Sequence, residues 1–149
     1  MDVSGTIEAI LGQKGREIFS VSPDATVFEA VEQMANKNVG ALLVVENGQL
    51  VGMISERDYT RKVMLRGKRS RETQVREIMS SDLTVITPRE PVENCLRMMT
   101  EKRIRHLPVL EGDTIRGIVS IGDLVKWVIA TQSAAIQHLE MYISGGYTG

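Results

Sequence analysis

The chain has 149 residues, the length of one compact domain. It is 42% hydrophobic and 25% charged, and no apolar run reaches the roughly 18–20 residues that a membrane-spanning helix needs. Aromatic residues make up 4% and the formal net charge is −1, so neither a base-stacking surface nor a global field favours nucleic acid or an anionic membrane as partner. The amino end lacks a signal-peptide pattern and there is one cysteine, so we expect a cytoplasmic protein.

An internal repeat organises the sequence. A shift of 65 positions aligns residues 20–59 with 85–124 without a gap, giving ten identities in forty pairs. An upstream segment, 7–11, also resembles 75–79 at an offset of 68. Each copy alone is small enough to be marginally stable, so we expect the two copies to pack sheet to sheet with a cleft along an internal two-fold axis.

In the first copy, Thr26 and Glu29 form a capping-box pattern ahead of an amphipathic stripe that begins at Val27. Asn47-Gly48 between two apolar runs, 41–45 and 50–54, then predicts a β-hairpin. The runs are continuously apolar, which predicts strands that are covered on both faces. A second helix is expected after the hairpin.

The second copy follows the same order with different signals. Pro91 suits the first helical position, and a buried stripe that includes Cys95 follows it. Residues 111–113 separate two further apolar runs, and a last helix is predicted to run to about Ile143, before Gly145-Gly146. These patterns predict an α/β (α+β) chain of two pseudo-symmetric repeats, each a small, mostly antiparallel sheet packed with two helices.

The sharpest motif is Gly-hydrophobic-hydrophobic-Ser-x-x-Asp, which occurs at 52–58 and again at 117–123. It places Ser55 and Asp58, and equally Ser120 and Asp123, at the amino end of a helix after a strand. Asp can accept both hydroxyls of a ribose, and the helix end favours an oxyanion. Ser-x-x-Asp is also a helix-capping pattern, and both readings can hold at once. The upstream glycine is expected to let a flat ligand approach the backbone.

The doubled motif, with Val75-Arg-Glu-Ile-Met79 ahead of the second copy and Ile104-Arg-His-Leu-Pro-Val109 inside it, resembles a tandem pair of cystathionine β-synthase (CBS) domains, a Bateman module. The resemblance covers about residues 5–130. The chain is most similar to stand-alone single-pair proteins of bacteria and plant organelles, including the ending Tyr142-Ile-Ser-Gly-Gly-Tyr147. The resemblance implies one module over 1–149, with repeats at 5–66 and 72–130 and a carboxyl-terminal helix and tail at 131–149.

The resemblance also implies function. Such modules bind adenosine-containing ligands between the repeats and commonly form dimers, so we expect an adenine-nucleotide-binding regulatory module that acts on a client protein as a homodimer. AMP is the first expectation, followed by ATP or ADP, NAD(H) and S-adenosylmethionine. The alternative is a constitutive dimerisation or scaffold domain with vestigial sites. No catalytic triad, P-loop or dinucleotide fingerprint is present, so neither catalysis nor a catalytic cofactor is expected.

Carried over by position, the resemblance implies that Asp58 and Asp123 hold ribose hydroxyls, assisted by Ser55 and Ser120. The residues expected to line the adenine pockets are Val21, Val39, Gly40, Ala41, Ile86 and Ile104. Arg105 and His106 are the two cations expected to reach phosphate from the opposite repeat, and Arg57, at the end of a helix, is the last candidate. Gly40-Ala41 stands in the first copy where the second has Arg105-His106. We therefore predict unequal sites, with the phosphate held better near Asp58.

Other signals have ordinary interpretations. Residues 57–76 carry a net charge of +6 in an otherwise acidic chain, which is typical of a solvated linker, although contact with a second phosphate is an alternative. Cys95 is predicted to be buried and inert, and His138 to be a surface or interface residue. With His106 and His138 as its two histidines, the chain has little material for a metal site, and none is expected.

Overall fold

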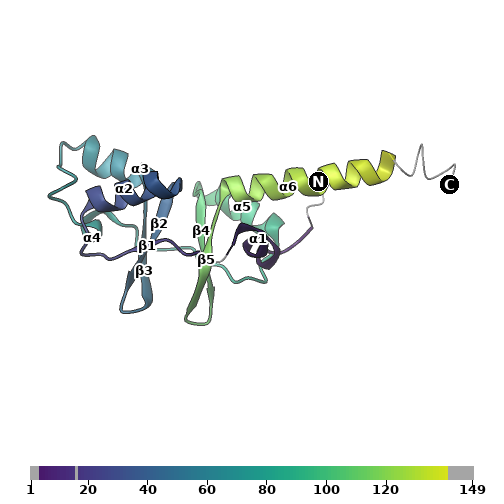
Figure 1. The fold of residues 1–149 in the computed structure, drawn as a ribbon, viewed down its shortest axis with the longest axis horizontal. Helices are drawn as coiled ribbons and strands as arrows, with labels where there is room; N and C mark the ends of the chain where they lie inside the picture. The colour runs from purple at the N-terminus through teal and green to yellow at the C-terminus, as the bar shows by residue number, and fades with distance from the viewer. Residues whose placement is uncertain (1–3, 16, 141–149) are drawn as a thin grey trace.

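The computed structural model describes residues 4–15 and 17–140, and for 134–140 it describes the helix but not the side chains. The predicted helix end near Ile143, the Gly145-Gly146 stop and the ending at 142–147 lie outside the described residues, and so does the side chain of His138. The fold is the expected mixture of helices and small sheets in two repeats (Figure 1).

The first repeat contains a three-stranded sheet in the order β1-β2-β3. Its elements are β1 (Ser20–Val21), α2 (Val27–Lys37), β2 (Ala41–Glu46), β3 (Gln49–Ser55), α3 (Glu56–Tyr59) and a π-helical turn η1 (Thr60–Met64). β1 pairs in parallel with β2, whereas β2 and β3 form the antiparallel hairpin. The sheet is therefore mostly antiparallel, as predicted.

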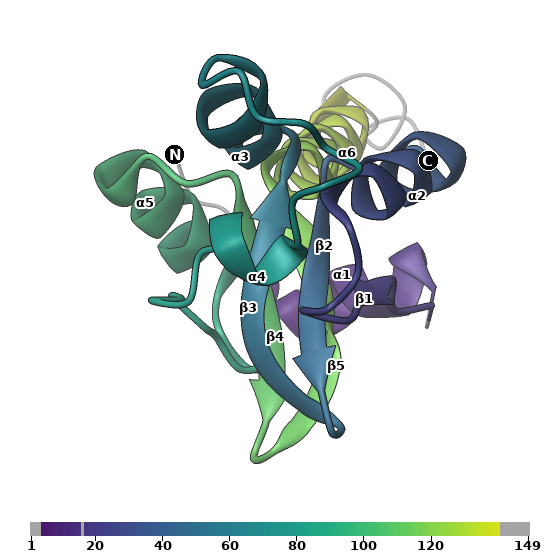
Figure 2. The ribbon, with the colours of Figure 1, turned by 90° about the vertical axis from the view of Figure 1, so that its left-hand side faces the viewer.

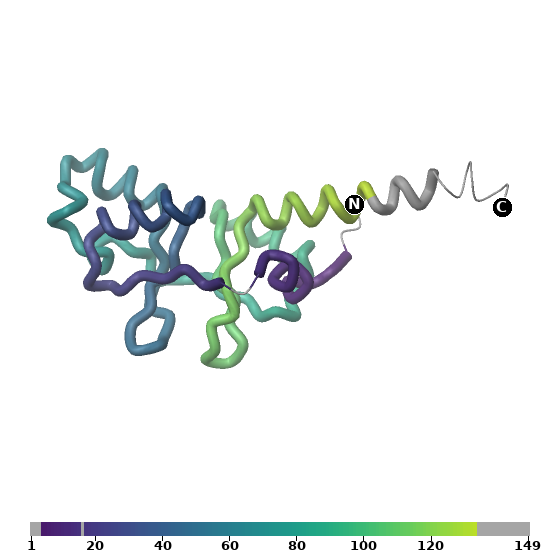
Figure 3. The backbone as a smooth tube through the Cα atoms, in the orientation of Figure 1, coloured from purple at the N-terminus to yellow at the C-terminus, as the bar shows by residue number. Residues whose placement is uncertain are grey.

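The second repeat has the same plan with a reduced sheet. Its elements are α5 (Val92–Lys102), β4 (His106–Glu111), β5 (Thr114–Ser120) and α6 (Ile121–Glu140). β4 and β5 are antiparallel, and an isolated parallel bridge from Ile86 to Val109 stands where β1 lies in the first repeat. In Figure 3 the described part of α6 extends away from the sheets.

Local sequence signals produce most of these boundaries. The Thr26–Glu29 capping box is present, with Glu29 N–H donating to Thr26 Oγ1 at 3.1 Å and Thr26 N–H to Glu29 Oε2 at 3.0 Å. Asn47 and Gly48 both have positive φ, 53° and 77°, as a two-residue type I′ hairpin turn requires. One boundary differs by a residue: Pro91 is the N-cap of α5 rather than its first helical residue, and its carbonyl accepts the first helical hydrogen bonds.

The two hydrophobic cores exchange their short helices. Helix α1 (Ile7–Lys14) precedes the first repeat, yet Ile7, Ile10 and Leu11 are buried in the core of the second repeat, beside α5 and β5. In Figure 3, α1 accordingly lies next to the second hairpin. Helix α4 (Val75–Ile78) precedes the second repeat but buries its side chains in the first core. The expected repeat at 5–66 thus contributes its first helix to the other half.

Both faces of the central strands are covered, as their continuous apolar sequences predict. In β2, Leu42 and Val44 belong to the first core, whereas the alternating Ala41 and Leu43 are buried outside it. Figures 1 and 2 show from two directions that the sheets face each other, with α2, α3 and α6 along one edge of the pair. The cleft between the repeats opens at the carboxyl ends of β3 and β5.

Candidate functional site

The two Ser-x-x-Asp motifs form matching helix caps. In the first, Asp58 N–H donates to Ser55 Oγ at 3.2 Å and Ser55 N–H to Asp58 Oδ2 at 2.9 Å. In the second, Asp123 N–H donates to Ser120 Oγ at 3.1 Å and Ser120 N–H to Asp123 Oδ2 at 2.8 Å. The capping reading is therefore right in both copies. The caps fix both carboxylates at the ends of β3 and β5.

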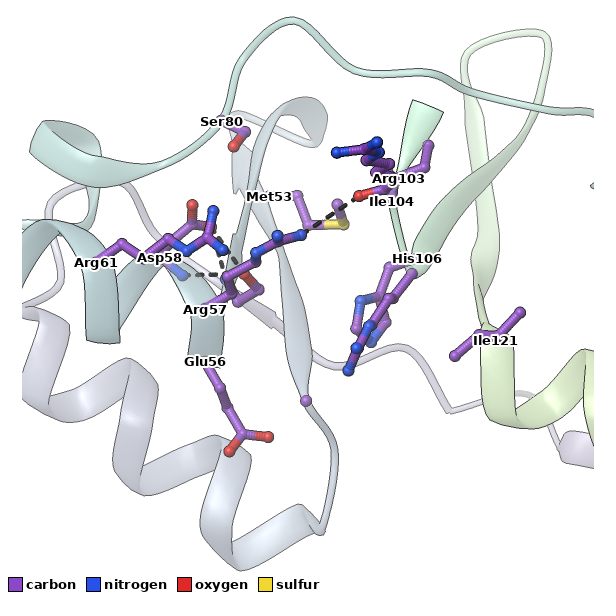
Figure 4. A pocket seen from close by; sticks show the side chains of 13 residues that line it. Met53, Glu56, Arg57, Asp58, Arg61, Ser80, Arg103, Ile104, His106 and Ile121 are labelled. Carbon is purple, nitrogen blue, oxygen red and sulfur yellow. Dashed lines mark hydrogen bonds between the residues drawn. The ribbon is translucent and has the colours of Figure 1, made fainter. Parts of the chain in front are cut away.

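A cavity of about 590 Å³ lies between the repeats at the Asp58 motif. This volume is within the range of small-molecule sites. The residues that line it come from both repeats: Gly40, Met53, Ser55, Glu56, Arg57, Asp58, Arg61 and Ser80 on one side, and Arg103, Ile104, Arg105, His106 and Ile121 on the other. Figure 4 shows Arg57, Asp58 and Arg61 on the first repeat facing Arg103 and His106 on the second.

The cavity is rich in positive charge. Arg57 and Arg61 line it from the first repeat and Arg103 and Arg105 from the second, and the Arg57 guanidinium donates to the Arg103 carbonyl at 3.3 Å. Guanidinium groups are the side chains best suited to bind phosphate with two parallel hydrogen bonds. Arginines from two sides therefore define an anion-binding region between the repeats.

Asp58 lies at the edge of this region with its carboxylate held in place. Its Oδ2 accepts hydrogen bonds from Ser55, and its Oδ1 lies 3.0 Å from Lys62 Nζ, one turn further along. Lys62 also donates to the carbonyl of Ile78 at 2.9 Å. The carboxylate is oriented and about 14% exposed, which leaves part of it accessible from the cavity.

His106 occupies the boundary between the two halves. A Cβ atom at Gly40 would lie 3.6 Å from His106 Nε2, an ordinary van der Waals contact between the two repeats, and 3.2 Å from Glu56 Oε1 of its own repeat. Burial lowers the pKa of His106, and the nearby Lys14 and Arg105 lower it further, although Asp123 acts in the opposite direction. The imidazole is therefore biased toward its neutral form, in which one nitrogen can accept and the other donate.

The structure gathers part of the expected set in this cavity. Of the candidates, Gly40, Ser55, Arg57, Asp58, Ile104, Arg105 and His106 line it, whereas Val21, Val39, Ala41, Ile86, Ser120 and Asp123 do not. Ala41 and Ile86 are each 4% exposed because they are buried in the fold, and Val21 and Val39 pack against the first core. Val39 also lines a neighbouring hollow that it shares with Gly40 and Glu56.

Two cavity residues, Arg61 and Arg103, were not among the expected site residues. Arg61 could have been found, because it follows Arg57 by four positions and therefore shares its helical face. Arg103 gave no such signal. It follows α5 with a left-handed φ of 55°, and this turn places it on the cavity wall.

The glycines of the two motifs make room for other parts of the protein. A Cβ atom at Gly52 would lie 2.7 Å from Met79 Sδ and 2.9 Å from the Ser80 carbonyl. At Gly117, where φ is +152°, it would lie 3.2 Å from a methyl group of Leu11. The exchanged helices α4 and α1 thus pack directly on these glycines.

Two further observations concern chemistry outside the cavity. Cys95 is completely buried, and burial raises the pKa of its thiol to about 12, with Glu90 adding to the effect, so its predicted burial is confirmed. Among the described residues, no group of three His, Cys, Asp or Glu side chains is arranged to hold a metal ion. The helices in that part of the chain include none with the length and apolar character needed to cross a membrane.

Duplicated helix-sheet repeats with a charged cleft between them define a paired regulatory-type domain, and comparison with known proteins agrees. The model of the CBS domain matches residues 15–65 and 75–130. The chain belongs to the CBS-domain family. It is 40% identical to the mitochondrial CBS domain-containing protein CBSX3 of Arabidopsis thaliana, over 97% of this chain and 74% of that one.

A bacterial relative and a solved structure extend the likeness. The CBS domain-containing protein YhcV of Bacillus subtilis is 36% identical over 79% of this chain and 84% of its own. The structure of a putative signal-transduction protein with CBS domains from Burkholderia ambifaria superposes with a TM-score of 0.82 and 44% identity, covering 86% and 96% of the two chains. The chain is therefore a CBS pair of the regulatory kind, as the sequence motifs indicated.

Proposed function

We propose that this CBS pair binds an adenosine ligand that carries phosphate, in the cavity at Asp58, and relays its presence to a partner protein. The observation that carries the proposal is one cavity with a fixed carboxylate on the first repeat and Arg103, Arg105 and His106 on the second. The carboxylate suits a ribose diol, the two arginines suit phosphate, and the neutral imidazole can donate or accept a hydrogen bond. Both ends of one nucleotide would then be held at once.

The cavity charge ranks the ligands. Four arginines face two acidic side chains, Glu56 and Asp58, so the lining favours an anion. AMP, ADP, ATP and NAD(H) all carry phosphate and are all favoured on this ground; AMP, the smallest of them, is the first to test. S-adenosylmethionine carries a positive sulfonium and is the least favoured. A more distant CBS pair, protein MJ0100, was solved with 5′-methylthioadenosine and S-adenosyl-L-methionine, which supports the adenosyl part of the proposal; it is 23% identical, with a TM-score of 0.74.

Calorimetric titration tests the proposal. The purified protein should bind AMP, ADP or ATP more tightly than adenosine, and the difference should shrink as salt rises because phosphate contacts are screened. Each hydrogen bond to a charged group contributes about 1.5–3 kcal/mol, so the phosphate should improve the dissociation constant at least tenfold. Equal affinity for adenosine and AMP, or no binding of either, contradicts the proposal.

The regulatory step follows from the placement of the cations. Arg57 and Arg61 belong to one repeat and Arg103 and Arg105 to the other, so an anion between them attracts both halves. A ligand shifts a conformational equilibrium by its differential affinity for the two states. Small-angle scattering should therefore differ between the ligand-bound and ligand-free protein, and an unchanged profile at saturation contradicts the relay.

A scaffold role is the second candidate, favoured by exposed apolar side chains. Val125 and Ile129 lie one turn apart on α6 and are 45% and 60% exposed, and Met64 and Leu65 at the end of η1 are 54% and 72% exposed. We propose that the α6 face that carries Val125 and Ile129 forms a homodimer. A CBS-CP12 protein of bloom-forming cyanobacteria, 29% identical over 81% of this chain and 69% of that one with a TM-score of 0.73, is described as hexameric. Light scattering of Ile129→Arg should show a smaller particle than the wild type.

A cytoplasmic location stays a prediction.

A further inference from the structure

The second carboxylate, Asp123, already has a cation from elsewhere in the chain. Lys14 Nζ lies 2.7 Å from Asp123 Oδ2 and donates to the carbonyl of Ile118 at 2.8 Å. The same oxygen of Asp123 accepts the Ser120 N–H. Both side chains are partly exposed, 33% for Lys14 and 19% for Asp123, against 14% for Asp58, so the bound lysine rather than burial distinguishes the second carboxylate. A ligand hydroxyl that approached this carboxylate would have to compete with Lys14.

The exchanged helices explain why only the second motif is engaged in this way. In the first repeat, α4 ends at Ile78, and Ser80 then pairs with Met53 through hydrogen bonds of 2.9 Å in both directions. In the second repeat, α1 continues as a helix to Lys14. Ile118 is the counterpart of Met53 at the offset of 65, and its carbonyl receives the Lys14 ammonium rather than a backbone N–H.

The cation at Asp58 has a different origin. Lys62 follows Asp58 by four residues, one turn further along the same helical segment, and Asp58 still lines the cavity. Lys14, in contrast, is 109 residues away from Asp123 in sequence and reaches it from α1. Burial favours protonation of Asp123, but hydrogen bonds from Lys14 and Ser120 outweigh it and lower the pKa of the carboxyl. The ion pair is thus the favoured state of this carboxylate at neutral pH.

We propose that Lys14 determines the binding stoichiometry of this chain: it closes the Asp123 position, so that one nucleotide binds, at Asp58. The inference rests on the proposed function only for the ligand at Asp58. It assigns to α1 a role in ligand selection that neither Ser-x-x-Asp motif encodes. Removing the ammonium opens the second carboxylate to a ribose diol. At the positions equivalent to Arg105 and His106 the first repeat has Gly40 and Ala41, so the second site lacks side chains that would bind phosphate. Its affinity for adenosine should therefore equal its affinity for AMP.

Two backbone amides report the two positions separately. The Ser55 N–H donates to Asp58 and the Ser120 N–H to Asp123, so their ¹H–¹⁵N resonances each follow one carboxylate. With the wild-type protein, AMP should shift and saturate the Ser55 resonance and leave Ser120 unchanged. With Lys14→Met, both resonances should saturate, and the dissociation constant read at Ser120 should lie at least tenfold below the highest AMP concentration that leaves Ser120 of the wild type unchanged.

The controls separate this inference from the proposed function. Lys126→Met removes an exposed lysine of α6 and should behave as the wild type. Thermal melts of each variant establish that the fold is intact, and Lys14→Gln replaces the methionine variant if that one unfolds. Two outcomes overturn the role of Lys14. In the first, the Ser120 resonance of the wild type saturates. In the second, both AMP and adenosine leave the Ser120 resonance of the folded Lys14 variant unchanged. A Ser55 resonance that never moves overturns the proposed function instead.

Discussion

Replacing Asp58 by asparagine tests the ribose contact with little disturbance of the fold. The variant removes the charge but retains a side-chain oxygen that can accept the Ser55 N–H, so the helix cap is kept. A hydrogen bond to a charged group contributes about 1.5–3 kcal/mol. Because Lys62 and Ser55 already occupy part of the carboxylate, we expect the lower part of this range, about 1.5–2 kcal/mol, or a loss of affinity of about 10–30-fold.

The size of the loss should depend on the ligand. Removing a negative charge from a cavity with four arginines strengthens its attraction for phosphate, and this gain partly offsets the lost ribose contact. Asp58→Asn should therefore weaken adenosine binding more than ATP binding. Calorimetric titration of both ligands at one salt concentration measures the difference directly. A larger loss for ATP than for adenosine would refute the assignment of Asp58 to the ribose.

The pseudo-symmetric residue supplies the matched control. Asp123→Asn makes the same change in the same type of helix cap, but Asp123 does not line the cavity. Its effect on AMP affinity at Asp58 should be smaller than that of Asp58→Asn, because Asp123 influences the cavity only through its charge near His106. Urea melts of the two variants should give similar stability changes. Equal losses of AMP affinity would show that the two motifs are equivalent and that the cavity is misassigned.

Three further outcomes follow from the described contacts. Burial and Lys14 lower the pKa of His106, so as pH falls below about 6.5 the unfolded chain binds the proton first, and the free energy of unfolding decreases until the pH reaches the lowered pKa. Urea melts of His106→Gln should lack this part of the pH dependence of stability, and the same pH dependence in the variant and the wild type counts against the lowered pKa. Gly52→Ala places a Cβ 2.9 Å from the Ser80 carbonyl and should lower the free energy of unfolding by about 1–3 kcal/mol in thermal melts. Gly12→Ala, which places its Cβ with no atom within 4 Å, should instead raise it by about 0.5–1 kcal/mol. A Gly52→Ala variant as stable as the wild type would contradict the close packing of Met79 and Ser80 on Gly52. Cys95 should react with a thiol reagent only after denaturant is added, and rapid labelling of the native protein would show that it is accessible.

Features fixed by neighbouring residues could be predicted from the sequence. The capping box at Thr26, the Asn47-Gly48 hairpin and the caps at Ser55 and Ser120 each depend on groups within four residues of one another. The repeat offset then related the two halves, because equivalent positions occupy the same place in the same order of helices and strands. The core stripes followed from helical periodicity, and the burial of Cys95 is one result.

Long-range partners could not be predicted in the same way. The likeness of 7–11 to 75–79 marked equivalent segments, which the structure shows to be α1 and α4, but it does not say which core each one enters. The choice depends on the path of the chain between the repeats, and the structure shows an exchange. The Lys14–Asp123 ion pair depends on that exchange and on the extra length of α1, so no spacing in the sequence indicated it.

The differences between the repeats are complementary, which explains why one cavity is formed rather than two equal ones. Gly40 and Ala41 align with Arg105 and His106 when the two repeats are compared. In the structure, the pseudo-two-fold arrangement of the repeats places Gly40 next to His106. An arginine at position 40 would need the space that the imidazole now fills and would add a fifth guanidinium to a region that already holds four. Small residues in one copy therefore allow large cations in the other to converge. With Lys14 engaging the second carboxylate, the cavity at Asp58 is where the proposed anion would contact both halves of the molecule.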